Sequence, residues 1–272
     1  MSAAVSVSDP PSGEVIARAL AALAPLRRLI QPKVYGLDDV TADGALFVGN
    51  HTLMGLLDLP LILAELWERG VTMRLLGDHA HFKLPLWREF LLAVGVVDGT
   101  RAITEALMVE GANILVFPGG GREVSKLKGE QYQLIWKNRL GFARLAIKHD
   151  YPIVPFASVG AEESLDIVID AENPALAPIR FAFEKITGSP DLWPVVRGVG
   201  PTPIPRPTRQ YYWFGSPIST AELVGRHDDD RVVRRLRERV RRSVEGGIEF
   251  LQTEQSRDPE ASLLKRILRP RT

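Results

Sequence analysis

The sequence predicts an α/β fold, with a mixed, mostly parallel sheet flanked by helices and an N-terminal amphipathic helix in front of it. Short apolar segments of strand length alternate along the chain with longer segments of helical periodicity, the order found in sheets built from βαβ units. Glycine and polar residues follow several strand segments, where such folds carry their reactive loops. With 272 residues and an apolar fraction of 45%, the chain can form one large domain or two small ones.

The expected elements follow one another in a regular order. Apolar segments of strand length, each running into a turn, stand at 45–50, 71–77, 113–121, 151–160 and 210–219. Segments of helical periodicity stand at 14–30, 56–69, 81–95, 100–111, 137–150 and 228–242. Eight prolines between residues 170 and 210 predict a loop or lid in that region.

These elements divide the chain into four segments. We expect a disordered leader at 1–13, an N-terminal amphipathic helical segment at 14–40, a main domain at 41–225 and a basic helical tail at 226–272. The first helix carries Arg18, Arg27 and Arg28 between its apolar positions. It therefore either caps the core or lies at a membrane interface.

Composition excludes several classes of protein. A formal net charge of +1 argues against a nucleic-acid partner, and the lack of cysteine excludes a thiolate nucleophile and Cys-ligated zinc. No apolar stretch reaches the length of about 18 residues that a spanning helix needs. The first residues lack the basic region and apolar core of a secretory signal, so we expect a cytoplasmic protein.

His51 is the histidine best suited to catalysis. It follows an apolar strand that ends in Gly-Asn, and Asp58 is the nearest carboxylate in sequence. An imidazole can take a proton from an attacking alcohol when a carboxylate holds its other nitrogen in the right tautomer. The pair would be a general base and its orienting acid; the alternative is a histidine whose hydrogen bonds are satisfied at a strand end.

The second candidate feature is the Phe-Pro-Gly-Gly-Gly-Arg-Glu sequence at 117–123. Three glycines at a strand end expose backbone N–H groups that can cradle an oxyanion or a phosphate, and Arg122 adds a cation. The same glycines would also make an ordinary tight turn. The sequence lacks the spacing of a P-loop or of a dinucleotide-binding turn, and there is no G-x-S-x-G elbow of a serine hydrolase.

Other polar clusters carry weaker signals. His79 and His81 lack further ligands nearby, so we expect no metal site and two solvated loop histidines. Lys126, Lys128 and Lys137 would either attract anionic headgroups and a thioester nucleotide or form a solvated face.

Together these motifs resemble the lysophospholipid and glycerolipid acyltransferase superfamily, the phospholipid/glycerol acyltransferase domain. The blocks that carry the resemblance are GNHTLMGLLD, GVVDGTRAITEAL, FPGGGREV, YPIVPFASVG and YYWFGSPIS, which cover roughly residues 45–220. The stretch from Lys137 to Glu163 is similar to the branch of monoacylglycerol and diacylglycerol acyltransferases and plant phytyl ester synthases. Residues 41–225 would then be the acyltransferase domain.

The resemblance implies catalytic roles for His51 and Asp58. It implies substrate-binding roles for Gly119, Gly120, Gly121, Arg122, Glu123 and Arg101. Two positions depart from the family pattern. Asp58 stands seven residues after His51, whereas the family places its aspartate at the position of Leu56, and Gly119 replaces the glutamate of the phosphate-acceptor enzymes.

The implied activity is acyl-CoA-dependent O-acyl transfer to a glycerolipid or other lipid hydroxyl, with no cofactor. Its partners would be an acyl-CoA or acyl carrier protein thioester, a lipid alcohol and a membrane surface. We expect a cytoplasmic protein bound peripherally to the inner face of the cell membrane. The alternatives are a 1-acylglycerol-3-phosphate (lysophospholipid) acyltransferase, a non-catalytic lipid-binding protein of the same fold, and a hydrolase that uses water as the acceptor.

Overall fold

A seven-stranded sheet, in the order β1-β9-β6-β2-β5-β3-β4, forms the centre of the protein. The structure is a computed structural model and describes residues 7–40, 44–55, 58–83, 85–188, 191–263 and 266. The strands of this sheet are β1 (Lys33–Tyr35), β2 (Leu46–Gly49), β3 (Met73–Gly77), β4 (Val96–Asp98), β5 (Asn113–Val116), β6 (Ile153–Val159) and β9 (Tyr211–Phe214). Neighbouring strands are parallel except β6 and β9, which are antiparallel. The predicted α/β fold with a mixed, mostly parallel sheet is therefore confirmed.

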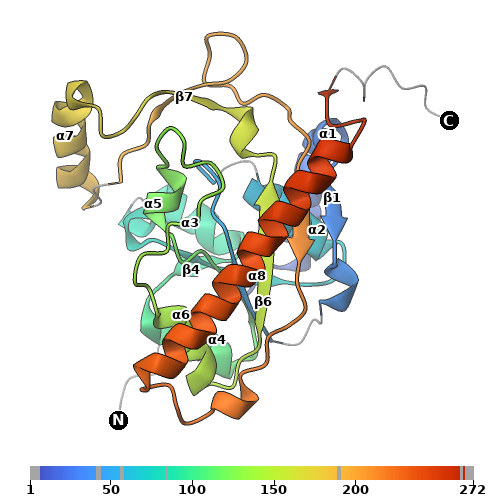
Figure 1. Cartoon of the computed structure of the whole chain (residues 1–272), viewed down its shortest axis with the longest axis vertical. Coiled ribbons are helices and arrows are strands. Elements are labelled where there is room, and N and C mark those ends of the chain that lie inside the picture. The colour runs from blue at the N-terminus through green and yellow to red at the C-terminus, as the bar shows by residue number, and fades with distance from the viewer. Residues whose placement is uncertain are drawn as a thin grey trace.

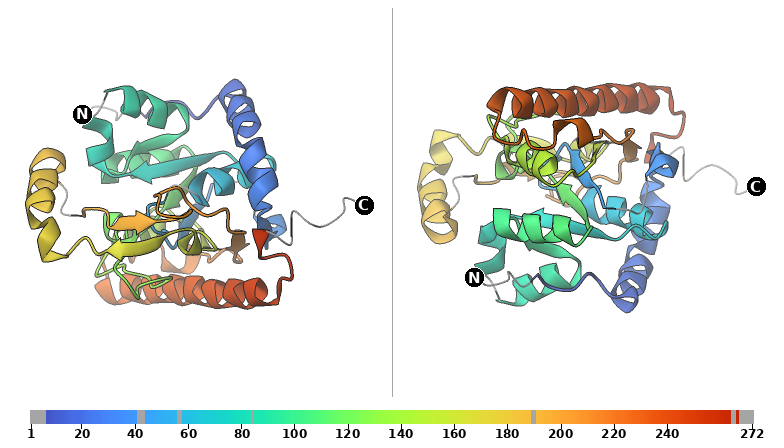
Figure 2. Two further views of the ribbon diagram at one scale, coloured as in Figure 1. Left: turned by 90° about the horizontal axis from the view of Figure 1, so that it is seen from above. Right: turned by 90° about the horizontal axis from the view of Figure 1, so that it is seen from below.

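Helices cover both faces of the sheet (Figure 1). They are α1 (Gly13–Ile30), α2 (Asp58–Trp67), α3 (Pro85–Ala93), α4 (Arg101–Val109), α5 (Gly121–Val124), α6 (Gly141–Lys148), α7 (Ala177–Thr187) and α8 (Asp230–Arg257). Short 3₁₀ turns are η1 (Leu37–Asp39), η2 (His79–Lys83), η3 (Glu162–Ser164), η4 (Pro174–Leu176) and η5 (Ala221–Leu223). Figure 2 shows α8 along one side of the sheet and α1 on the other. Two apolar cores result, one shared with α4, α6 and α8 and the other with α1 and α2.

The predicted N-terminal helix is present and packs on α2. Ser12 caps α1 by accepting the Val15 N–H at 3.3 Å, and apolar residues of α1 lie against the core that α2 completes. Arg27 bonds to Glu65 of α2 at 2.7 Å and also pairs with Glu68. The apolar side of this helix is thus used in packing. No helix in the described ranges has both the length and the apolar composition needed to cross a bilayer.

Residues 7–12, which belong to the segment expected to be a disordered leader, lie against the domain. The Ser8 hydroxyl accepts a hydrogen bond from Arg74 at 3.0 Å, and Pro11 is buried close to Gly95. Residues 1–6 lie outside the described part of the chain.

The C-terminal helix is longer than the segment expected at 228–242. Helix α8 runs to Arg257, and its apolar residues, including Val233, Val240 and Leu251, are fully buried against the sheet. A Cβ on Gly247 would lie 2.3 Å from the Trp213 ring, so this glycine permits close helix–sheet packing rather than ending the helix. The region is therefore part of the core.

The proline-rich region contains regular elements, so the expectation of an irregular loop is wrong for part of it. Strands β7 (Asp166–Ile169) and β8 (Val195–Arg197) pair in a separate antiparallel ribbon. Helix α7 lies in the chain segment that connects these two strands. Pro178 lies in the first turn of α7, where a missing N–H costs no hydrogen bond. As Figure 1 shows, this excursion lies outside the main sheet.

Candidate active site

His51 lies just beyond the carboxyl end of β2, and β2 is the strand between β6 and β5 in the sheet. The preceding Asn50 donates from its amide to the Ser158 carbonyl and accepts the Ser158 N–H, each at 2.9 Å. This reciprocal pair is fully buried and ties the end of β2 to β6. It fixes the direction in which the chain leaves the sheet, and therefore the position of His51.

The imidazole of His51 is held between an aromatic ring and a glycine. Phe117, which follows β5, stacks on it with 4.0 Å between ring centroids and 19° between planes. On Gly55, a Cβ would lie 2.2 Å from His51 Cε1, and this residue has φ of +57°. Any side chain at position 55 would thus displace the ring and strain the backbone.

Glu123 reaches the same place from α5. Its Oε2 accepts the His51 N–H at 3.0 Å and its Oε1 accepts the Ile135 N–H at 2.8 Å. The side chain is fully buried. Burial raises the pKa of Glu123 to about 6, against the opposing effects of the Lys126 charge and the two N–H donors. A residue expected to bind substrate thus bonds to the backbone of the predicted base.

Asp58 is the first residue of α2 and is completely buried. Its Oδ1 accepts the Leu59 N–H at 2.9 Å, whereas Oδ2 has no hydrogen-bond partner among the described residues. Burial raises the pKa of this carboxyl, partly offset by the nearby hydroxyls of Thr52 and Ser158, neither of which reaches hydrogen-bonding geometry with Oδ2. Leu56, at the family's aspartate position, lies outside the described residues.

The three glycines form a tight turn between β5 and α5. The Gly120 N–H donates to the Phe117 carbonyl at 3.0 Å, and φ at Gly120 is +52°. Within the described ranges, the amides of Gly119 and Gly121 donate to no other residue. These two N–H groups are the donors that the turn can offer to an oxyanion.

Arg122 is engaged within the protein. Its guanidinium bonds to both Glu130 oxygens, at 2.6 and 2.8 Å, and to the Ser125 carbonyl at 3.2 Å. The expected cation beside the glycine turn is therefore neutralised by Glu130.

A pocket of about 400 Å³ adjoins the turn and has Phe117, the residue stacked on His51, in its wall. Its apolar lining comes from Leu46, Leu76, Met108, Val116, Phe142 and Leu145. Arg101, Arg139 and Arg144 also line it, and Arg101 bonds to Glu105 at 2.9 Å. An apolar cavity with a few charged groups is typical of a small-molecule site.

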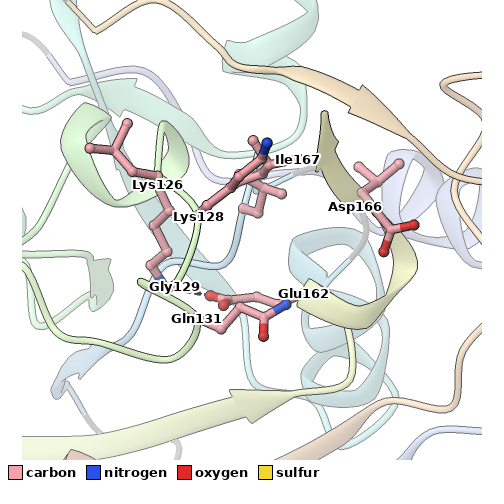
Figure 3. A pocket seen from close by; sticks show the side chains of 10 residues that line it. Lys126, Lys128, Gly129, Gln131, Glu162, Asp166 and Ile167 are labelled. Carbon is pink, nitrogen blue, oxygen red and sulfur yellow. Dashed lines mark hydrogen bonds and ion pairs between the residues drawn. The ribbon is translucent and has the colours of Figure 1, made fainter. Parts of the chain in front are cut away.

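A second pocket, of about 190 Å³, has Leu53, two residues after His51, in its lining. Figure 3 labels seven of its other lining residues. Lys126, Lys128, Gln131 and Glu162 contribute to its polar lining. Lys126 is only 1% exposed and pairs with Glu162, so the sequence interpretation of a solvated lysine face is wrong for this residue. The charge run in the sequence gave no sign of its buried partner.

The remaining histidines lie elsewhere. His79 is exposed and pairs with Asp98 at 2.7 Å, and the side chain of His81 is outside the described part of the structure. Among the described residues, no three His, Asp or Glu side chains gather as a metal site would require.

The sheet, the strand-end histidine and the glycine turn define an α/β domain of the acyltransferase type. Residues 31–159 match the profile of the family described as Acyltransferase, and the chain belongs to this superfamily, as its motifs predicted. It is 31% identical over 256 residues to phytyl ester synthase 2, chloroplastic, of Arabidopsis thaliana, which covers 86% of this chain and 36% of that protein.

Two further similarities were found. The "DGAT1/2-independent enzyme synthesizing storage lipids" of Mus musculus is 30% identical over 132 residues, 48% of this chain and 40% of that protein. The crystal structure of the 1-acyl-sn-glycerophosphate (LPA) acyltransferase PlsC from Thermotoga maritima gives a TM-score of 0.43 at 17% identity, over 86% of this chain and 78% of that one. The chain spans well under half the length of these curated relatives, 36% and 40% respectively.

Proposed function

We propose that this protein is an acyl-CoA-dependent O-acyltransferase that esterifies a neutral glycerolipid or another lipid alcohol, with His51 as the general base. The observation that carries the proposal is the position of His51 at the end of β2, stacked on Phe117 beside an apolar pocket. A general base needs this fixed position because proton transfer requires hydrogen-bonding distance to the attacking hydroxyl.

In this mechanism His51 takes the proton of the acceptor hydroxyl as its oxygen bonds to the thioester carbonyl carbon. The amides of Gly119 and Gly121 are available to the oxyanion of the tetrahedral intermediate. The intermediate then breaks its C–S bond, and the proton on His51 passes to the departing thiolate. The products are an ester and a free thiol, and no acyl-enzyme is required.

The pocket beside Phe117 suits the acyl donor. Its apolar lining can take an acyl chain, and Arg139, which donates to the Pro118 carbonyl at 2.9 Å, brings positive charge near the phosphates of a coenzyme A thioester or of an acyl carrier protein. Arg101 and Arg144 line the same pocket but are paired with Glu105 and Asp230, so they would have to exchange these partners to bind a phosphate. The donor would then approach His51 from the β5 side of the sheet.

A neutral acceptor is favoured by the state of Arg122. Its two-point contact with Glu130 leaves it a poor clamp for an acceptor phosphate, and Gly119 carries no acidic side chain. The names of two relatives, a phytyl ester synthase and an enzyme synthesizing storage lipids, point to the same class of product. The alternative acceptor is 1-acylglycerol-3-phosphate.

The test is an acceptor screen with one labelled acyl-CoA. We expect a higher kcat/KM for monoacylglycerol, diacylglycerol or a long-chain alcohol than for lysophosphatidic acid in matched vesicles. A clear preference for lysophosphatidic acid would replace the proposed acceptor by the phosphorylated one. Release of free fatty acid alone would indicate a hydrolase, and no turnover with any acceptor would indicate a non-catalytic lipid-binding protein.

We further propose peripheral attachment at the inner face of the cell membrane through the helix at 14–30. Its apolar side packs on α2 and Arg18 pairs with Glu14, so the exposed Arg28 is the cation of this helix that we expect to meet anionic headgroups, a contact worth about 1 kcal/mol. Arg28→Glu should weaken flotation with anionic vesicles, whereas Arg231→Glu on α8 should not. A wild-type protein that ignores such vesicles at low ionic strength would exclude this mode of attachment.

A further inference from the structure

The carboxylate of Glu123 occupies the space that a side chain at position 119 would need. An ideal Cβ on Gly119 would lie 2.0 Å from Glu123 Cδ and 2.4 Å from Glu123 Oε2. Contacts this short are incompatible with any side chain at 119 while Glu123 keeps its position. The glycine at the motif's glutamate position is therefore matched by a carboxylate that comes from four residues further along the chain.

This carboxylate bonds to the backbone. Both of its oxygens accept N–H groups, from His51 at 3.0 Å and from Ile135 at 2.8 Å. With the side chain fully buried, neither oxygen is directed to solvent. Glu123 thus joins the loop after β2 to the loop that follows α5.

Lys126 contacts the other main-chain polar group of His51, its carbonyl. Its ammonium donates to the His51 carbonyl at 3.2 Å and pairs with Glu162, which also accepts the Tyr132 N–H at 2.8 Å. Both the N–H and the C=O of His51 are therefore held by buried charged side chains from residues 123–126. A hydrogen bond from Met54 to the Val124 carbonyl, at 3.0 Å, strengthens the same junction.

We infer that Glu123 and Lys126 are positioning residues for acyl transfer, which act by clamping the main chain of His51 so that its ring keeps the orientation in which Phe117 stacks on it. This inference rests on the proposed function, because it concerns the proposed general base. Glu123 then holds the backbone of the base, whereas the motif suggested that it contacts the substrate directly. A small displacement of a catalytic group, about 1 Å, can cost about 100-fold in rate.

The hydrogen bonds of the clamp depend on the protonation state of the Glu123 carboxyl. The charged groups that face the Glu123 carboxylate are Lys126, whose charge lowers its pKa, and Glu162, whose charge raises it. Protonation would turn one carboxylate oxygen into a donor opposite an N–H group, so the clamp is complete only when Glu123 is ionised. Activity that depends on it should fall as the pH drops below about 6.

The first test is Glu123→Gln in the full chain. An amide opposes one of the two N–H groups with its own N–H, so we expect kcat to fall about 10- to 100-fold while KM for acyl-CoA changes little. The matched control is Glu65→Gln, at a buried glutamate of α2 that pairs with Arg27 of α1. This variant should lose stability but keep its kcat. A rise in KM with unchanged kcat would assign Glu123 to substrate binding and overturn the inference.

A double mutant separates the clamp from the proposed function. If Glu123 acts through His51, adding Glu123→Gln to His51→Ala should cause no further loss of rate. An additional loss of the same size would overturn the clamp while leaving His51 as the base. Wild-type turnover by His51→Ala alone would instead overturn the proposed base.

The wild-type pH–kcat profile covers the case in which Glu123→Gln does not fold, because it should have an acid limb near pH 6. Glu162→Gln keeps an acceptor for the Tyr132 N–H but takes the charged partner from Lys126, at a cost in stability. It also removes a negative charge beside Glu123, so the pKa of Glu123 should fall in the folded variant. The acid limb of the pH–kcat profile should move to lower pH. An acid limb that stays in place would argue against Glu123 as the titrating group and overturn the pH-dependent clamp.

Discussion

The ring of Phe117 stacks on the imidazole of His51 at a centroid distance of 4.0 Å, which brings the ends of β5 and β2 into direct contact. The two motif blocks are 66 residues apart in sequence (117 minus 51), but β2 and β5 are neighbours in the sheet. Parallel pairing places their carboxyl ends at the same edge. The contact explains why a histidine block and a glycine-turn block can form one site.

His51→Ala should reduce acyl transfer about 100- to 10,000-fold, as expected for loss of a general base. The thermal midpoint should change little, because the ring is only partly buried and lies at a strand end. Circular dichroism and a turnover assay with labelled acyl-CoA measure both effects. Wild-type turnover by the folded variant would mean that another group removes the proton.

Gly119→Ala should lower both stability and activity, because its Cβ would meet the Glu123 side chain at 2.0 Å. Overpacking of this kind typically costs about 1–3 kcal/mol. The matched control is Gly246→Ala in α8, where a Cβ meets nothing within 4 Å and helix propensity favours alanine. Equal unfolding free energies for Gly119→Ala and the wild type would show that Glu123 can move aside.

Asp58→Asn should reduce kcat, but by less than His51→Ala. The carboxylate is buried and accepts the Leu59 N–H through Oδ1, while Oδ2 has no hydrogen-bond partner among the described residues. Steady-state kinetics of the two variants side by side give the comparison. An unchanged rate for Asp58→Asn would transfer the orienting role to another carboxylate.

Much of the site could be predicted because its signals are local. The strand before His51 and the glycine turn after β5 are recognisable from a few consecutive residues, and the order of elements predicts which strand ends share an edge. The buried pairing of Lys126 with Glu162 joins residues 36 positions apart. No periodicity in the sequence indicates such a contact. From the sequence, Lys126 could therefore be interpreted only as part of a charge run with Lys128 and Lys137.

The sequence did not predict some helices and strands, and the physical reason is similar. Strands β1 and β4 have three residues each, too few for an alternating pattern. Helix α8 continues through Gly246 and Gly247, residues of low helix propensity, because its far half packs on the sheet. Tertiary contacts decided these elements, and local preference did not.

Arg122→Ala distinguishes a donor contact from an acceptor contact. If Arg122 leaves Glu130 to bind the phosphates of coenzyme A, the variant should have a higher KM for acyl-CoA with every acceptor. Glu130→Gln, which frees the same guanidinium, should then lower that KM. A defect confined to lysophosphatidic acid would instead assign Arg122 to an acceptor phosphate.

Asp258→Asn should destabilise the fold by about 1–3 kcal/mol at neutral pH, because charged hydrogen bonds would be lost. Asp258 follows α8, and its Oδ2 accepts from Tyr211 at 2.8 Å, Arg209 at 3.0 Å and Lys33 at 3.1 Å. Burial alone would raise the pKa of Asp258. The hydrogen bonds from Tyr211 and Lys33 and the Arg209 charge outweigh burial and lower that pKa below its ordinary value of 3.8.

The sign of the pH dependence follows from this lowered pKa. The stabilisation by Asp258 is complete above its ordinary pKa and is lost as the pH falls through the lowered pKa of the folded state. The difference in unfolding free energy between wild type and Asp258→Asn should therefore shrink below about pH 4, as denaturant titrations at several pH values can measure. Asp228→Asn, at an exposed aspartate, should show no such difference. A gap between wild type and Asp258→Asn that persists undiminished to pH 2 would mean that the ion pairs of Asp258 do not cause it.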